Sequence, residues 1–204
     1  MTNTFTQQEK HILEEGFKAI SQAGAKSFTV ESLAERLGMS KKTIYKYFPT
    51  KEKLIRKIVL FITGQVEQKF IKIQETEENP AAQFIRVMNH ISKFASRAPI
   101  HLLAQLKSTC PSAWKEIETF RLKRQENFYR ILKSAQDQGF ARNDIDMKKF
   151  SIIFINMINN TFQPEFFLQN DLAVGETIDG LKGIISRGIF TTEGLEAIQQ
   201  YYEK

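Results

Sequence analysis

Residues 29–51 read TVESLAERLGMSKKTIYKYFPTK, and this stretch predicts two short helices joined by a tight turn. Thr29 is suited to be an N-cap, and apolar residues follow it at the i, i+3, i+4, i+7 spacing of one helix face. Gly38 predicts the end of that helix, because glycine adopts a positive φ at this position without steric cost. Ser40 predicts the N-cap of the second helix. The pattern is typical of a helix-turn-helix, whose second helix enters the major groove of DNA.

The second helix of this pair has an apolar inner face and a donor-rich outer face. Ile44 and Phe48 lie four residues apart and therefore point to the same side. Over residues 36–57, eight basic residues accompany the single acid Glu52. The eight are Arg36, Lys41, Lys42, Lys46, Lys51, Lys53, Arg56 and Lys57. A lysine-rich helix is often only a solvated surface, but a basic excess on a helix-turn-helix pattern favours binding to nucleic acid.

The chemistry of the outer side chains indicates which part of DNA each would contact. Lysine ammonium groups and a threonine methyl group can meet base edges such as guanine O6 and N7 or the thymine methyl. The predicted base contacts are Lys41, Lys42, Thr43 and Lys46. Hydroxyls at helix starts, phenols and a terminal ammonium group suit phosphates. The predicted phosphate contacts are Thr29, Ser40, Tyr45, Tyr47 and Lys51. The ring of Tyr45 could instead lie against the first helix, as part of the core.

Three motifs in this stretch resemble a known family. They are Leu-Ala-x-x-Leu-Gly from Leu33, Ser-x-x-Thr-Ile-Tyr-x-Tyr-Phe from Ser40 and Thr-Lys-Glu-x-Leu from Thr50. The run from Thr29 to Leu54 is similar to the N-terminal domain of TetR-family transcriptional regulators. The resemblance implies a DNA-binding N-terminal domain, a helical body that binds an effector, and a homodimer.

Charge is concentrated in the N-terminal part of the chain, which has 204 residues and a net charge of +6. Residues 1–60 carry eleven Lys and Arg against six Asp and Glu, and the remaining residues carry eighteen against seventeen. This segregation indicates that the N-terminal domain meets a polyanion. The polar N-terminus lacks a signal-peptide core, and the longest charge-free apolar segment, 151–164, is too short to span a bilayer. Cys110 has no second cysteine to pair with. We therefore expect a cytoplasmic protein that does not bind a membrane.

The remainder of the sequence shows helical spacing and no strand pattern, so the predicted fold class is all-α, with about nine or ten helices. A capping-box pattern at 6–9 begins a first helix that ends near Gly24. Further helices are expected over about 51–74, from Pro80 toward Pro99, and over 112–138, 146–164, 174–189 and 192–201. We expect a helix-turn-helix DNA-binding domain in 1–50. A helical ligand-binding and dimerisation domain is expected in 51–204.

The last two long helices carry more apolar surface than one packing face needs. Part of it is expected to meet a partner subunit, although both helices could instead fill the core of the monomer. The candidate interface residues are Phe150, Ile158, Ile178, Leu181, Ile185 and Ile189. The resemblance implies a homodimer through these two helices. Pairing would place two reading helices about 34 Å apart, on successive major grooves of a near-palindromic site.

The body also carries side chains typical of a pocket for a small hydrophobic effector. The candidate pocket residues are Phe84, Met88, Phe94, Trp114, Phe128, Phe154, Met157, Asn156 and Asn160. The aromatic members are equally typical of a core. The asparagines are more suggestive, because buried amides need partners.

Enzyme motifs are missing from the sequence. His11, His90 and His101 show no metal-binding spacing, and there is no P-loop, G-x-G-x-x-G or G-x-S-x-G motif. We expect no catalytic residue, metal or cofactor. The sequence predicts a repressor that binds double-stranded DNA as a homodimer and is released by a small hydrophobic molecule. The alternative is a lipid- or protein-binding module on the same fold without operator-specific DNA binding, which would have little reason to keep the lysine bias of the second helix.

Overall fold

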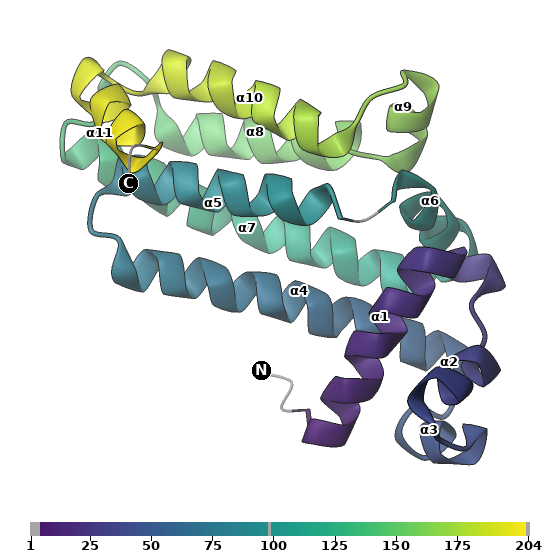
Figure 1. Ribbon diagram of the computed structural model, residues 1–204. Coiled ribbons are helices and arrows are strands. Elements are labelled where there is room, and N and C mark those ends of the chain that lie inside the picture. The colour runs from purple at the N-terminus through teal and green to yellow at the C-terminus, as the bar shows by residue number, and fades with distance from the viewer. Residues whose placement is uncertain (1–4, 98, 203–204) are drawn as a thin grey trace. The chain divides into compact units, whose positions relative to one another are not determined.

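The computed structural model describes residues 5–97 and 99–202, and in these ranges the chain is all-α, as predicted (Figure 1). The described ranges hold eleven helices. They are α1 (Gln7–Ser27), α2 (Val30–Leu37), α3 (Lys41–Tyr47), α4 (Lys51–Thr76), α5 (Pro80–Ala95), α6 (Ile100–Thr109), α7 (Pro111–Asp137), α8 (Met147–Thr161), α9 (Pro164–Gln169), α10 (Val174–Ile189) and α11 (Thr192–Tyr202). None of these helices is long and apolar enough to cross a lipid bilayer.

Two short helices, α6 and α9, raise the number above the nine or ten expected. The helix capped by Asp146 ends at Thr161 instead of continuing to Pro164. Pro164 begins α9, because proline lacks the N–H that a helix interior needs but is accommodated in the first helical turn. Pro164 therefore marks the start of a new helix and not the end of the preceding one.

Side-chain caps determine where several helices begin. Thr6 and Glu9 form the predicted capping box of α1: Thr6 Oγ1 accepts the Glu9 N–H at 3.2 Å, and Glu9 Oε2 accepts the Thr6 N–H at 2.8 Å. The cap of α11 lies one residue before residue 192, where the sequence predicts the start of this helix. Thr191, and not Thr192, accepts the N–H of Gly194, at 3.2 Å. Local sequence therefore places these helix starts to within one residue.

Contacts divide the chain into two compact units. Unit 1 comprises Met1–Gln65 and Ala98–Thr119, and unit 2 comprises Val66–Arg97 and Phe120–Lys204. The helices α4 and α7 each begin in unit 1 and continue into unit 2. These units do not follow the predicted boundary at residue 50. The assignment of DNA binding to 1–50, and of ligand binding and dimerisation to 51–204, stays a prediction.

Unit 1 is held together by a single core around the helix-turn-helix. Leu33 and Ile44 are fully buried there, and Leu102 of α6 is buried with them. α1 packs against α2 and α6. Gly16 allows α1 to approach α4 closely, because a Cβ at that position would lie only 2.7 Å from Ile58 Cδ1. The helix-turn-helix is thus supported by a helix about sixty residues further along the chain.

In unit 2, α5 packs against α10 and α11. An aromatic cluster lies in the core of this unit. The ring of Phe84 lies 6.1 Å from that of Phe128 and 5.1 Å from that of Phe190, between centroids. Phe128 also stacks on Phe154 at 5.0 Å. These rings join α5, α7 and α8 with the residue that follows α10.

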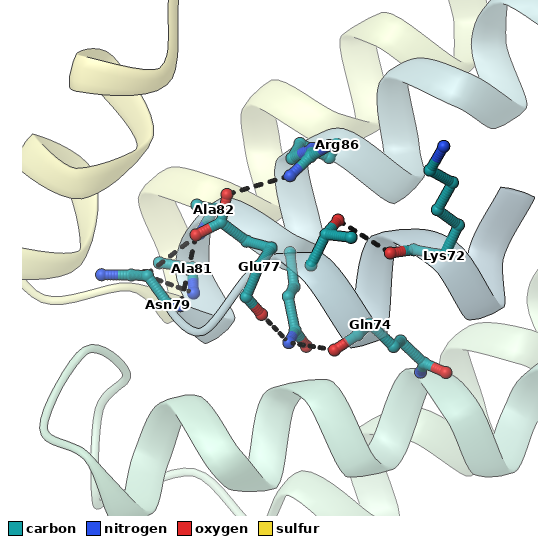
Figure 2. A network of polar contacts seen from close by, with 9 residues as sticks. Lys72, Gln74, Glu77, Asn79, Ala81, Ala82 and Arg86 are labelled. Atoms are coloured by element: carbon teal, nitrogen blue, oxygen red, sulfur yellow. Dashed lines mark hydrogen bonds and ion pairs between the residues drawn. The ribbon is translucent and has the colours of Figure 1, made fainter.

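The turn that joins α4 to α5 is fixed by polar contacts, which Figure 2 shows. Asn79 Oδ1 accepts the backbone N–H groups of Ala81 and Ala82 at 2.9 and 3.1 Å. Arg86 Nη1 lies 3.1 Å from Glu77 Oε2. These contacts cap α5 and tie its first turns to the residue after α4. They therefore determine the direction in which α5 leaves α4.

Candidate nucleic-acid interface

The segment α2–turn–α3 has the geometry that its local sequence predicts. Thr29 Oγ1 accepts the N–H of Ser32 at 3.1 Å and caps α2. Gly38 ends α2 with φ +62° and ψ +29°, in the left-handed region that favours glycine. Ser40 Oγ accepts the N–H of Thr43 at 3.0 Å and caps α3. Short-range capping and one glycine thus set the angle between the two helices.

The helix α3 buries one face and exposes the other. Ile44 is completely buried and Phe48, directly after the helix, is 3 % exposed, as their spacing predicts. Lys42 and Lys46 are exposed, and Thr43 is half-buried beside them. In the described part of the chain neither lysine has a carboxylate oxygen within 4 Å of its ammonium nitrogen. These two lysines therefore offer free donors on the outer face.

Lys41 differs from the other lysines of α3 because it forms an ion pair with Glu31 of α2. Its Nζ also lies 5.6 Å from the centroid of the Tyr45 ring. The hydrogen bond between the two side chains raises the pKa of Lys41 and lowers the pKa of Glu31. A DNA phosphate would have to compete with the Glu31 carboxylate for this ammonium group. Sequence reasoning missed Glu31, because the pair forms across the turn between two helices.

Two of the basic residues counted in the sequence serve as structural ties within unit 1. Arg36 Nε lies 2.7 Å from Glu15 Oε2 and joins α2 to α1. Arg56 Nη2 lies 2.6 Å from Glu116 Oε1 and joins α4 to the first turns of α7. The two acids lie outside the sequence window in which the basic excess was counted. The positive charge available to DNA is therefore smaller than the count indicates.

The predicted phosphate contacts lie in different surroundings. Thr29 and Ser40 are exposed at the starts of α2 and α3. The rings of Tyr45 and Tyr47 are half-buried and pack against the core of unit 1, so Tyr45 partly fulfils the alternative prediction of a core role. Lys51 is half-buried at the first residue of α4. All five residues nevertheless belong to one short stretch around α2 and α3.

The predicted pocket residues are not brought together. Four are core residues of unit 2: Phe84, Met88, Phe128 and Phe154. Phe94 is half-buried in the same unit, whereas Trp114 is buried in unit 1. Three lie on the exposed face of α8: Asn156, Met157 and Asn160. Because Asn156 and Asn160 are exposed, the expectation that these amides are buried does not hold, and Asn160 Nδ2 donates to Asn156 Oδ1 at 2.5 Å.

A surface depression of about 440 Å³ lies beside the connection from α7 to α8. Its lining residues are Tyr129, Lys133, Gln136, Asn143, Asp144, Ile145, Asp146, Met147 and Lys148. None of the nine predicted pocket residues is among them. Most of the lining side chains are polar or charged, whereas a hydrophobic effector is expected to have a mainly apolar lining.

The predicted interface residues mostly face the core of unit 2. Ile178, Ile185 and Ile189 are buried, and Phe150, Ile158 and Leu181 are half-buried. The large apolar residues that α8 and α10 do expose are Ile152, Ile153, Met157 and Ile184. Helical spacing identified the apolar positions of both helices but could not distinguish the two apolar faces.

Comparison with known proteins agrees with this geometry. Residues 12–58, which include all of α2 and α3, match the family described as bacterial regulatory proteins, tetR family. The chain is 28 % identical over 190 residues to the uncharacterized HTH-type transcriptional regulator YvaF of Bacillus subtilis (strain 168), which covers 93 % of this chain and 99 % of that protein.

Solved structures show a similar fold. A TetR transcription regulator from Haloarcula marismortui ATCC 43049 superposes with a TM-score of 0.73 at 14 % identity, over 92 % of this chain and 100 % of that one. The TetR-family regulator PfmR from Thermus thermophilus superposes with a TM-score of 0.58 at 23 % identity, over 86 % and 97 %. Together with the capped helix-turn-helix and its exposed lysines, these similarities identify residues 12–58 as a DNA-binding domain of the tetR family of bacterial regulatory proteins, in a chain whose fold resembles that of TetR-family regulators.

Proposed function

We propose that this protein is a repressor that binds a near-palindromic operator as a homodimer and is released by a small hydrophobic molecule. The observation that carries operator reading is the outer face of α3. Lys42 and Lys46 are exposed there, while Ile44 and Phe48 anchor the opposite face in the core. Because its inner face is anchored, α3 can present these two ammonium groups to guanine O6 and N7.

The dimer surface that we propose lies on the exposed apolar residues of α8 and α10. Ile153 is 67 % exposed and Ile184 is 71 % exposed. Gly180 and Gly188 lie four residues before and after Ile184, on the same face of α10. The space around both glycine Cβ positions is open to 4 Å. A partner helix could therefore approach this face closely and cover the isoleucine.

The exposed face of α8 fits the same role. Ile153, Asn156, Met157 and Asn160 follow one another at the i, i+3, i+4, i+7 spacing of a single face. An apolar face that also carries hydrogen-bonding amides is typical of a protein interface. Such a dimer would present two α3 helices to successive major grooves, about 34 Å apart.

The effector site is proposed for the helical body, which carries the aromatic cluster. α4 begins at Lys51, directly after the helix-turn-helix, and continues into unit 2. A molecule that binds one arrangement of the body better than another would therefore act on the reading helices through α4. A coupling of about 1–3 kcal/mol would change DNA affinity about 5- to 150-fold.

Selection of bound sequences from a random duplex pool with the purified full chain tests this function. We expect enrichment of a near-palindrome whose half-sites lie about 10 base pairs apart, centre to centre. A double variant with Lys42→Ala and Lys46→Ala should enrich no sequence, whereas Lys123→Ala, which removes an exposed lysine of α7, should select the same site as the wild type. Failure of the wild-type protein to enrich any sequence would favour the lipid- or protein-binding alternative.

A further inference from the structure

An arginine lies in the middle of the apolar face of α7. Arg124 is four residues from both Phe120 and Phe128, so the three side chains share one face of the helix. The Arg124 side chain is only 13 % exposed. Its Nη2 pairs with Glu67 of α4, whose side chain is 33 % exposed. A cation in this position is unusual, because taking a charge out of water is costly unless partners compensate for it.

Two aromatic rings lie beside this guanidinium group. Arg124 Cζ lies 4.8 Å from the centroid of Phe120 and 5.3 Å from that of Phe70. The two rings stack on each other with centroids 6.3 Å apart. Cation–π contacts of this kind stabilise the charge but leave the N–H groups at the edge of the guanidinium without acceptors.

The N–H groups of Arg124 are incompletely satisfied. The Nε and Nη1 atoms are buried, and neither donates a hydrogen bond to any group in the described part of the chain. These atoms carry three of the five N–H donors of an arginine. Buried donors without acceptors are rare in proteins and call for a partner. Here the missing partner would be an acceptor with negative charge.

A histidine that contacts the same Phe70 ring is incompletely satisfied in the same way. The ring of His90 contacts Phe70 edge-on, with centroids 5.7 Å apart. Its Nε2 atom is buried, and no hydrogen-bond partner is found for it among the described residues. Burial, and then the positive charges of Lys69, Arg97 and Lys93, lower the pKa of His90. The ring is therefore neutral near pH 7 and can offer one N–H without adding a second buried charge.

We propose that Arg124 and His90 bind the anionic head group of an amphipathic carboxylate, whose apolar tail lies among the aromatic side chains of unit 2. The proposal rests on the ligand-responsive function above and assigns the chemical class of its effector. The carboxylate would supply acceptors to the unsatisfied donors, and Phe70 and Phe120 already form the apolar surroundings. Charge-assisted hydrogen bonds to arginine are among the strongest that a protein site offers.

Binding at this position also has a consequence for α4. Glu67 lies on α4 and Arg124 on α7, so their ion pair ties the two helices together within unit 2. A bound carboxylate would compete with Glu67 for the same guanidinium group. α4 begins immediately after the reading helix, so weakening this tie gives the effector a route to DNA affinity.

Calorimetry and DNA-release assays on the full chain test the proposal. The probes are the n-alkyl carboxylates from butanoate to dodecanoate, with the alcohol and the amine of each chain length as matched neutral and cationic compounds. We expect at least one carboxylate to bind, and its alcohol and amine to bind more weakly by about 10-fold or more, because only the carboxylate accepts from Arg124. The same carboxylate should release operator DNA.

Three variants separate this site from a purely structural role of Arg124. Arg124→Met should weaken carboxylate binding about 10- to 100-fold. Arg130→Met is the matched control, since it removes an exposed arginine of the same helix, and it should bind like the wild type. Glu67→Gln should bind the carboxylate about 5-fold more tightly, because it removes the competing group while keeping Arg124. This gain keeps the proposal testable if Arg124→Met does not fold.

Three outcomes would overturn the anion site: no carboxylate of the series binds, alcohol and carboxylate bind equally, or Glu67→Gln binds no more tightly than the wild type. None of these outcomes affects operator binding itself. Failure of the proposed function would appear differently, as a wild-type protein that selects no DNA sequence even without any probe.

Discussion

The DNA-reading surface of unit 1 and the exposed apolar surface of unit 2 are built in opposite ways. The first depends on residues that are neighbours in sequence: Ser40 caps α3, and Ile44 anchors it four residues later. The second depends on which face of α8 and α10 the core covers, and the core includes residues from α5 and α7. The first surface can be read from a short motif, whereas the second cannot.

The sequence predicts which polar side chains are exposed better than it predicts which apolar side chains are exposed. A lysine on a short helix goes outward wherever the helix packs, because its charge is costly to bury. An isoleucine fits either side of a helix that has two apolar faces. Ile184 and Ile185 illustrate this, since they are adjacent in sequence but 71 % and 6 % exposed. The proposed dimer surface therefore needs experimental tests of its own.

The strongest test of the comparison places a charge on the exposed apolar surface. Ile184→Glu should give a monomeric mass in light scattering at micromolar concentration, because it would bury a carboxylate in the proposed interface. Operator affinity should fall about 10²- to 10⁴-fold, since the two reading helices would no longer be linked. Leu122→Glu, at an exposed apolar residue elsewhere in unit 2, should leave both the mass and the affinity unchanged. A dimeric mass for Ile184→Glu would remove α10 from the interface.

On the DNA-reading surface, Lys51→Ala should weaken binding to all duplexes alike. A lysine that contacts phosphate carries no sequence information, so affinity should fall about 5- to 10-fold near 0.1 M salt, and the slope of log K against log salt should become shallower by about one. Fluorescence anisotropy with operator and random duplexes over a salt series measures both effects. Lys123→Ala, with the same change in charge, should keep the wild-type slope. An effect of Lys51→Ala on the operator alone would contradict a phosphate contact.

Thr43→Ala should act on a single position of the operator. The variant loses a hydroxyl and a methyl group at the start of α3, so discrimination at one base pair should fall by about 1 kcal/mol. Competition among all single-base-pair variants of the selected operator measures this change. Uniform weakening on operator and random DNA would show that Thr43 supports the helix through Ser40, whose Oγ lies 2.8 Å from Thr43 Oγ1, and does not read a base.

The smallest expected effect concerns the ion pair that sequence reasoning missed. Glu31→Gln should free Lys41 and remove a negative charge beside the DNA backbone, so binding should tighten by up to about 5-fold. The gain should shrink as salt is added, because both charges are exposed. Glu35→Gln removes another exposed carboxylate of α2 and serves as the control. If both variants tighten binding equally, the effect comes from net charge and not from the Lys41 pair.

Much of the fold could be predicted because helix starts and stops have local signals. The capping box at Thr6, the glycine stop at Gly38 and the cap at Asp146 all lie where the sequence predicts them. The short helices α6 and α9 were missed, because helices of one to three turns have too little periodicity to distinguish them from a loop. Their formation depends on packing, as the burial of Leu102 in the core of unit 1 illustrates.

The candidate sites show the same difference between local signals and contacts that depend on packing. Every predicted DNA contact lies in the helix-turn-helix or directly after it, and the three lysines of its reading helix are exposed. The predicted pocket residues lie apart in the structure, because aromatic residues at helical spacing belong to cores as readily as to binding sites. No sequence pattern distinguishes Arg124 from the other arginines. Only its burial beside aromatic rings, with unsatisfied donors, distinguishes it from an ordinary surface arginine.

The amino-acid sequence by itself determined that this chain is helical, that it carries a helix-turn-helix and that lysines cover the reading helix. These properties follow from interactions within one or two helical turns, namely caps, glycine conformation and the cost of burying charge. The tertiary structure decided which apolar faces of α8 and α10 stay exposed, that Glu31 pairs with Lys41 and that Arg124 lies buried beside Glu67. Contacts of this kind join helices distant in sequence or separated by a turn, and no local preference specifies them.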